Sequence, residues 1–300
     1  MRPPLSYIPL LPVALLVIAV TLIVNPIGRN YPDTLRADGQ KGIVESAKTN
    51  NTGQHLVVAI DSKSQGKIKT LLTVPSVYTT FQTGDSVTFC CNMRKPTPRT
   101  AYENDYTGAL KAQGIIYTGF VPPDSIMVTA TAGNIYWRIR RLRPLASELL
   151  KRSSLSAPTC EFLNATLTGD TSTLTDDTRN LFSSAGVAHI LALSGMHVGI
   201  LTVVIGVALF PLYLFRMRRL QLSLTIVALW GYAIFTGLSP SVTRAAVMAT
   251  AIAGGLILQR RYFGFNGLLL ALCIILAISP RQLYQPGFQM SFLSVASILA

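Results

Sequence analysis

The stretch that decides the fold is His189-Ile190-Leu191-Ala192-Leu193-Ser194-Gly195-Met196-His197-Val198-Gly199-Ile200-Leu201. It places two histidines, a serine and a glycine in a run that is otherwise hydrophobic enough to enter a bilayer. A charged group at the centre of a membrane helix costs about 2.5–3.5 kcal/mol, so ionisable residues there usually face a pathway or a partner. The stretch predicts a membrane protein that passes or handles something within the bilayer.

Composition places the whole chain in the same class. Half of the 300 residues are hydrophobic and only 13% are charged, which is typical of a membrane protein rather than a soluble domain. The net charge is +13, yet no acidic residue follows Asp177. Such an excess suits a polyanionic partner, either nucleic acid or anionic lipid headgroups. A positive-inside bias together with solvated surface arginines is the alternative explanation.

The N-terminal segment has no charge between Leu5 and Val24, which is long enough to span the hydrocarbon core. A cleaved signal peptide with Arg2 as its basic region is the alternative, but Asn25-Pro26 offers no small-residue cleavage site. We expect residues 1–30 to form an uncleaved transmembrane anchor.

Residues 31–131 have a different character, with short β-rich runs broken by turns. Strands are expected at 42–47, 55–61, 71–77, 86–92, 115–120 and 125–129. The number and spacing of these strands predict a small barrel of the OB type, a shape that by itself says little about function. The aromatic candidates for stacking on bases in this region are Tyr78, Phe81, Tyr102, Tyr106 and Tyr117.

Residues 132–186 are expected to form amphipathic helices on a membrane surface. Apolar residues recur every three or four positions from Ile135 to Leu149, Tyr136 and Trp137 serve as interfacial anchors, and Pro144 is expected to kink or break the helix. A second helix should begin near Thr175 and end near Gly186. Lipid is the expected contact and DNA the alternative. The surface basic residues are Arg138, Arg140, Arg141, Arg143, Lys151 and Arg152.

Residues 187–300 are predicted to form a transmembrane domain, with spans near 187–215, 220–236, 241–258, 263–279 and from 288 onward. The basic loops at 216–219 and 260–261 should be cytoplasmic, so residues 25–186 should be extracytoplasmic. The fold class is therefore an α-helical polytopic membrane protein with an inserted extracytoplasmic OB-like barrel. Because the chain stops inside a hydrophobic run, we expect it to be a fragment of a longer polypeptide.

Three cysteines lie in the predicted external region. One of the adjacent pair Cys90 and Cys91 is a candidate to form a disulfide with Cys160, and unpaired packing cysteines are the alternative.

Two further clusters carry polar residues into spans. Pro240 and Ser241 start one span, and a helix N-terminus there can attract phosphate. Arg244 follows one turn later without an acid in the membrane region to pair with. Gln289 and Ser291 enter the last span. These residues, together with His189, Ser194, Gly195 and His197, are the candidates for lining a passage.

Catalysis is not expected from these residues. Ser194 with His197 is similar in part to intramembrane serine proteases, but position 192 is Ala where the protease motif has Gly, and no histidine follows His197. Two intramembrane histidines without a nearby cysteine or acid do not make a zinc site either. We therefore expect no metal, no cofactor and no enzymatic activity.

Taken together, the clusters resemble the ComEC-type competence family, inner-membrane channels for DNA uptake in bacterial natural transformation. The matching residues, in family order, are Gly169-Asp170, Asp177-x-Arg179, Phe182-x-x-x-Gly186-x-x-His189-Ile190-Leu191-Ala192-Leu193-Ser194-Gly195-Met196-His197-Val198, Pro240-Ser241-Val242-x-Arg244-Ala245 and Pro286-Gly287-Phe288-Gln289-Met290-Ser291-Phe292. The stretch Asn104-Asp105-Tyr106-x-x-x-Leu110-x-x-x-Gly114-Ile115 resembles the part of the family's barrel domain that precedes its last strands.

This resemblance implies a bacterial inner-membrane protein that passes single-stranded DNA, contacts anionic lipid and works with other DNA-uptake proteins. Family members often have two or more spans before the barrel, whereas one is evident here. Some carry a nuclease domain after the channel, and no such domain is assigned to these residues. A transporter of small anionic solutes is the main alternative function, and a structural membrane scaffold is the third.

Overall fold

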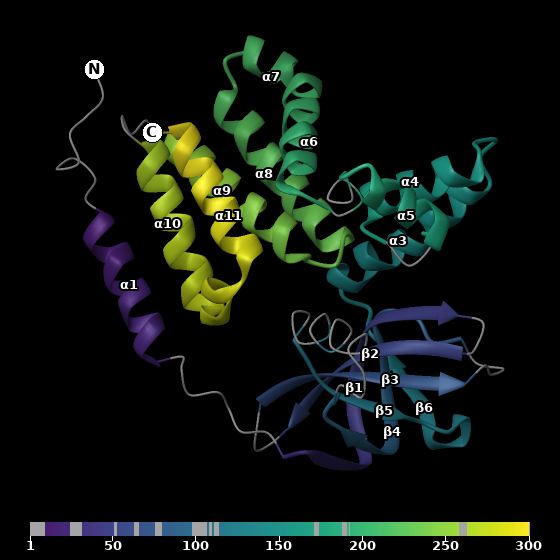
Figure 1. Ribbon diagram of the computed structural model, residues 1–300. Coiled ribbons are helices and arrows are strands. Elements are labelled where there is room, and N and C mark those ends of the chain that lie inside the picture. The colour runs from purple at the N-terminus through teal and green to yellow at the C-terminus, as the bar shows by residue number, and fades with distance from the viewer. Residues whose placement is uncertain are drawn as a thin grey trace. The chain divides into compact units, whose positions relative to one another are not determined.

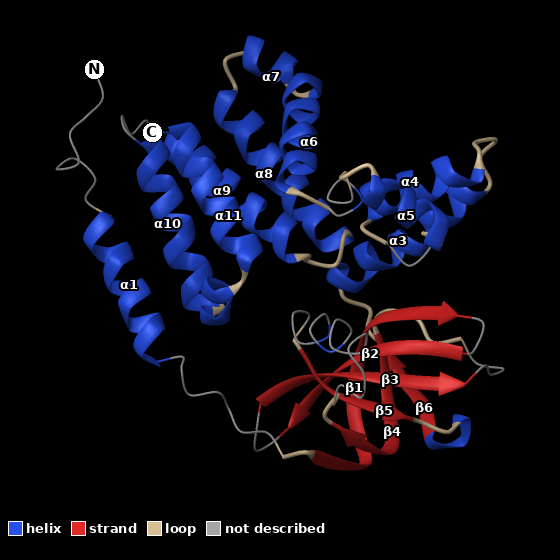
Figure 2. Ribbon diagram, viewed as in Figure 1, coloured by secondary structure: helices blue, strands red, loops and turns tan. Residues whose placement is uncertain are grey.

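The computed structural model describes residues 10–24, 32–50, 53–62, 66–75, 80–97, 107, 110, 114–170, 174–187, 191, 193–257 and 263–299. The chain divides into two compact units, Met1–Arg29 with Arg143–Ala300, and Asn30–Leu142. Figure 2 shows that the described strands all belong to the second of these units.

The unit Asn30–Leu142 is a closed five-stranded β-barrel with a sixth strand added at one edge (Figure 1). Its strands are β1 (Thr34–Asn50), β2 (Gly53–Ser62), β3 (Gly66–Pro75), β4 (Asp85–Arg94), β5 (Ile115–Phe120) and β6 (Ile126–Thr131), with the short 3-10 helix η2 (Pro123–Ser125) between the last two. The strand order is β1-β2-β3-β5-β4, and β4 pairs back with β1 to close the barrel. Only β3 and β5 pair in parallel. This OB-like barrel confirms the sequence prediction.

Strand β1 makes the closure possible because it is long enough for two partners. Its first part, from Thr34 to Ile43, pairs with β4, and its second part, from Gly42 to Asn50, pairs with β2. The register shifts once in each ladder, and such bulges bend a strand and increase its twist. The sequence predicted only 42–47 here, because residues 34–41 are mostly polar and show no alternation.

The barrel core is filled from alternate positions of each strand. In β2, Leu56, Val58 and Ile60 are buried. Tyr117 in β5 is completely buried, and its hydroxyl donates a hydrogen bond to the Pro32 carbonyl at 3.0 Å. Phe81 belongs to the same core. These two aromatic side chains pack the barrel and so cannot stack on bases. The other three candidates, Tyr78, Tyr102 and Tyr106, lie outside the described residues.

Helix α3 (Ile135–Lys151) begins in the barrel unit and ends in the helical unit. It runs through Pro144 without ending there, so the prediction of a break was wrong. Within the barrel unit, Arg141 donates from Nε to the Thr83 carbonyl and from Nη2 to the Ala132 carbonyl, both at 3.0 Å. These bonds fix the start of the helix to the barrel.

The helical unit contains one helix before the barrel and the remaining helices after it. They are α1 (Leu11–Val24), α4 (Ala157–Thr168), α5 (Asp176–Ser184), α6 (Gly195–Ala208), α7 (Phe210–Leu214), α8 (Arg218–Phe235), α9 (Pro240–Ile257), α10 (Phe263–Ile278), the short 3-10 helix η5 (Pro280–Tyr284) and α11 (Pro286–Leu299). Helix α4 was not predicted from the sequence. Ser156 is its N-cap residue and a proline lies in its first turn, both of which are helix-start signals.

Helix α9 is the centre of the bundle, because its side chains take part in two hydrophobic clusters. One cluster joins Val242 and Ala246 of α9 to α6 and α8. The other joins Val247 and Met248 of α9 to α10 and α11, with α1 packed against it through Val17 and Ile18. Figure 1 shows α1, in purple, beside α10.

Among the described residues, only α9 is both long and apolar enough to cross a membrane, and Pro12–Thr21, Gly195–Ala208, Gly264–Ile278 and Pro286–Leu299 are shorter apolar helices. Within the span expected at 187–215, the helix α6 begins at Gly195 after the extended Ser194, and it ends before Pro211 of α7. The multi-pass arrangement stays a prediction.

Candidate functional site

Ser194 and His197 form a cap at the start of α6. Ser194 is the N-cap residue, with its Oγ 2.9 Å from Nδ1 of His197 and its backbone N–H donating to the same nitrogen at 3.3 Å. A backbone N–H can only donate, so Nδ1 is the acceptor and the proton of the neutral imidazole lies on Nε2. His197 thus presents a single N–H to its surroundings.

Helix α6 begins at Gly195, and His189 lies outside the described residues, so the relation between the two histidines stays a prediction. Gly195 is the first residue of α6. A Cβ built on this glycine would meet no atom within 4 Å in the described part of the chain.

A hydrogen bond joins this turn to the start of α9. The Ser241 hydroxyl donates to the Leu193 carbonyl at 2.6 Å, across 48 positions of sequence. Leu193 and Val242 also belong to the same hydrophobic cluster. The structure therefore brings together two of the three polar clusters that the sequence singled out.

Arg244, near the start of α9, is a buried charged residue at this site. It is only 7% exposed, and the described residues offer it neither a hydrogen bond nor an ion pair; its Nε is buried without a partner. A buried guanidinium normally has an acid or several carbonyls beside it. Two hydroxyls of the same helix start, Ser239 Oγ and Thr243 Oγ1, are likewise buried without a partner. These two hydroxyls were not predicted as site residues, because a missing hydrogen-bond partner can be recognised only in the packed structure.

The third polar cluster reaches Arg244 through Gly287 of α11. A Cβ built on Gly287 would lie 3.5 Å from Nη2 of Arg244. Gln289 is exposed and donates to the Leu283 carbonyl at 3.0 Å, and Ser291 is half-buried. Pro240 is exposed at the first position of α9. Of the predicted passage residues, Ser241 is linked to the α6 cluster through Leu193, and Arg244 lies beside Gly287 of the α11 cluster.

The place where the turn before α6 (Leu193 and Ser194) meets the starts of α9 and α11 is called the junction below. Gly169 also packs against this junction, a contact that was not predicted. It ends α4 in the left-handed conformation, with φ of 73°, and its N–H donates to the Ala165 carbonyl. A Cβ at this position would collide with the Leu193 side chain. The positive φ favours glycine, and the Leu193 side chain would have to shift to admit a Cβ. A glycine directly after a helical segment is the sequence signal that could have identified the turn.

The predicted surface basic residues divide into two groups. Arg140 is buried, with its guanidinium 5.6 Å from the Tyr136 ring centre and 5.4 Å from that of Trp137, so its assignment to the surface was wrong. Arg141 is occupied by the barrel contacts described above, and Arg143 is half-buried. The exposed members are Arg138, Lys151 and Arg152, the last of which pairs with Glu148.

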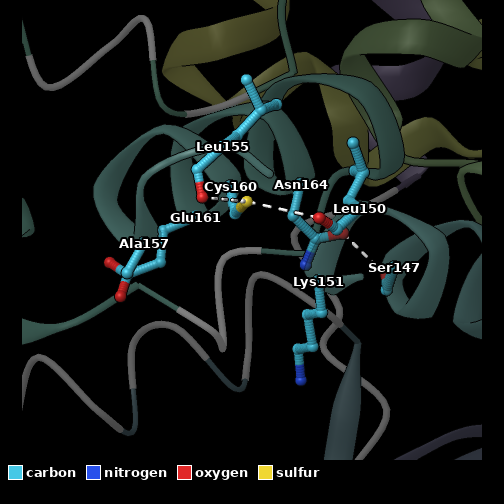
Figure 3. Close-up of a pocket in the computed structure, with 8 residues that line it drawn as sticks. All are labelled: Ser147, Leu150, Lys151, Leu155, Ala157, Cys160, Glu161 and Asn164. Atoms are coloured by element: carbon cyan, nitrogen blue, oxygen red, sulfur yellow. Dashed lines mark hydrogen bonds between the residues drawn. The ribbon is translucent and has the colours of Figure 1, made fainter. Parts of the chain in front are cut away.

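A cavity of about 410 Å³ lies between α3 and α4 (Figure 3). Its lining includes Cys160, whose thiol donates to the Leu150 carbonyl at 3.3 Å, and Ser147, whose hydroxyl donates to Asn164 at 2.6 Å. Both polar groups are therefore used in holding α4 against α3. We assign the cavity no chemistry.

The four cysteines are free, so the candidate disulfide with Cys160 is not confirmed. Cys160 is engaged with carbonyls of its own helical unit. Cys90 is exposed and accepts a hydrogen bond from the Gly39 N–H at 3.0 Å. Cys91 packs against the barrel core, and burial, with a smaller effect of Cys90, raises the pKa of its thiol to about 11.

Glu161 fixes α5 to α4. One of its carboxylate oxygens accepts from the Thr175 N–H, the Thr175 hydroxyl and the Thr178 hydroxyl, at 3.0–3.1 Å. The Thr175 N–H, helped by the two hydroxyls, lowers the pKa of this carboxyl. This network caps α5, next to the segment that leads to the junction.

The fold and the junction define a class of protein, a helical bundle with an OB-like barrel inserted after its first helix and polar motifs gathered at the start of α6, α9 and α11. Residues 166–300 match the family model described as "Competence protein". This part of the chain is similar to the competence protein family, the family that the motifs predicted.

The chain is similar to "ComE operon protein 3" of Bacillus subtilis (strain 168), with 33% identity over 130 residues. That similarity covers 43% of this chain and 16% of the relative, so it concerns only a small part of the longer protein. No solved structure matches this chain.

Proposed function

We propose that this chain forms part of a channel that passes single-stranded DNA across the bacterial cytoplasmic membrane in natural transformation. The observation that carries the proposal is Arg244, a buried cation without a partner among the described residues, at the point where the family's motifs meet. A cation kept without an internal partner suits an anionic substrate. The role is transport, with no catalytic step assigned to these residues.

Exposed apolar surface supports placing the bundle in a membrane. Val203 and Val207 of α6 are 66% and 68% exposed, and Leu293 and Ile298 of α11 are 64% and 83% exposed. Soluble proteins rarely leave so much contiguous apolar surface in water, whereas lipid would cover it. Helices α8 and α9 have 18 residues each, a rise of about 27 Å, which is close to the hydrocarbon thickness. The proposed location is the inner membrane, with several spans and with residues 25–186 outside.

The charge distribution supports DNA over a cation as the transported species. The whole segment after Asp177 contains arginines and no acid. Pathways for cations are lined with acidic side chains, and pathways for anions with basic ones. Small anionic solutes fit the same criterion, and they remain the alternative substrate.

Helix α3 supports contact with anionic lipid headgroups. Its apolar residues Ile135, Leu142, Leu145 and Leu149 are each more than half exposed and recur at helical spacing, while Arg138, Lys151 and Arg152 remain exposed on the same helix. An amphipathic helix of this kind lies in the membrane interface. Other DNA-uptake proteins are the proposed protein partners.

The test is the import of labelled DNA by the native host after deletion of the gene. The proposal expects surface binding of DNA to continue while DNA in the cytoplasm disappears, with import restored by the full-length gene supplied in trans. Membrane integrity is controlled by the uptake of an unrelated solute. Unchanged import after deletion would refute the channel and favour the small-anion carrier, which uptake of labelled anionic solutes would then test.

A further inference from the structure

We infer that a phosphate-sized anion binds between the N-termini of α9 and α11, held by the guanidinium of Arg244. This inference rests on the proposed function, because it names the group of the DNA that the junction would contact: a phosphodiester of the passing strand.

Both helices have first-turn N–H groups that donate to no backbone acceptor in the described part of the chain. The first bond of α9 runs from the Thr243 N–H to the Ser239 carbonyl at 2.9 Å, so the N–H groups of Ser241 and Val242 precede it. In α11 the first bonds come from Phe288 and Gln289, both to Gln285, so the Gly287 N–H remains. Free N–H groups and the helix dipole make each N-terminus attractive to an anion.

Arg244 adds a full positive charge at the same place. Its side chain is 93% buried, starts in the second turn of α9 and brings Nη2 to within 3.5 Å of a Cβ position on Gly287, at the start of α11. A cation directed at the positive end of a helix is unfavourable unless an anion lies between them. No ion pair joins Arg244 to a carboxylate in the described part of the chain, and the sequence has no acid after Asp177.

The remaining donors fit a phosphate. Ser239 Oγ and Thr243 Oγ1 are buried without a partner at the start of α9, alongside the free N–H groups. Hydroxyls, backbone N–H groups and arginine are the groups with which proteins contact phosphodiester oxygens. A free phosphate or a lipid phosphate presents the same oxygens, so the experiment has to separate these sources.

The experiment uses the full-length protein purified in detergent and a fluorescein-labelled oligothymidylate of twelve nucleotides, titrated over a series of salt concentrations. Arg244→Met should weaken binding on the order of 10- to 100-fold, as expected for loss of a charge-assisted contact. It should also reduce the slope of log K against log salt by about 0.7, the value for one phosphate contact on a single strand. Arg244→Lys should recover the slope. Arg179→Met, which removes an exposed positive charge from α5, is the matched control and should leave both values unchanged.

A second variant supplies the missing anion from the protein itself. Gly287→Asp places a carboxylate beside Arg244 and at the N-terminus of α11, so it should raise the melting temperature and weaken oligothymidylate binding together. Gly287→Asn, which has the same size without the charge, measures the steric part of the effect.

An unchanged salt slope in Arg244→Met would overturn the inference, while loss of DNA import on gene deletion would still uphold the channel. A lower melting temperature in Gly287→Asp would also overturn it, because an acid from elsewhere in the protein would then already pair with Arg244. In a further outcome, inorganic phosphate or phosphatidylglycerol raises the melting temperature of the unmodified protein but not that of Arg244→Met, while both proteins bind oligothymidylate equally well. That result would refute DNA as the source of the phosphate.

Discussion

Replacing Gly169 by alanine tests whether the end of α4 packs against the turn that leads into α6. Two costs are expected. Alanine at φ of 73° carries the left-handed penalty of about 1–2 kcal/mol. Its Cβ would also overlap the Leu193 side chain, and overpacking of this kind costs about 1–3 kcal/mol. The total expected loss is therefore about 2–5 kcal/mol.

The measurement is reversible unfolding of the full-length protein in mixed micelles by titration with SDS, followed by circular dichroism. The two costs separate in a double-variant cycle, because Leu193→Ala removes the atoms with which the new Cβ collides. The backbone cost of Gly169→Ala should persist in the Leu193→Ala background, while the steric cost should disappear. The expected coupling is about 1–3 kcal/mol, opposite in sign to the sum of the single losses.

Additive losses within about 0.5 kcal/mol would show that Gly169 and Leu193 are not in contact. The packing of the end of α4 against Leu193 would then be refuted. A loss of less than about 0.5 kcal/mol for Gly169→Ala alone would refute the left-handed conformation as well.

Three further predictions concern other contacts. At pH 8, maleimide should label exposed Cys90 readily and Cys91 far more slowly, because a pKa of about 11 leaves roughly one Cys91 thiol in a thousand ionised; equal labelling by mass spectrometry would contradict this. The lowered pKa of Glu161 means that its stabilisation of α5 is complete above the ordinary carboxyl pKa of about 4.3 and is lost as the pH falls through the lowered value. Hydrogen exchange of the α5 amides, corrected for intrinsic rates, should show this acid dependence, and Glu161→Gln should abolish it; the same pH profile in both proteins would exclude the mechanism. Ser241→Ala should cost about 0.5–1.5 kcal/mol through its lost bond to the Leu193 carbonyl, measured by the same SDS titration, and a neutral result would argue against that link.

The sequence by itself determined the classes of structure in this chain. Alternating apolar residues with turn signals located all six strands, because a barrel strand buries every second side chain whatever its neighbours are. The hydrophobic runs located the helices of the bundle, although their ends were wrong where a cap decides them, as at Ser194. The motifs also predicted the family whose model matches residues 166–300, since they depend on residue identity alone.

Only the tertiary structure decided which of these residues meet. The sequence could not show that Ser241 bonds to Leu193 or that Gly287 lies beside Arg244. Nor could it show that the guanidinium of Arg140 is buried against two aromatic rings. Contacts between distant segments depend on how helices pack, and helical periodicity fixes a face of each helix without fixing its neighbour. The lack of a partner for Arg244 among the described residues is a property of the same kind, because it depends on which side chains pack around the guanidinium.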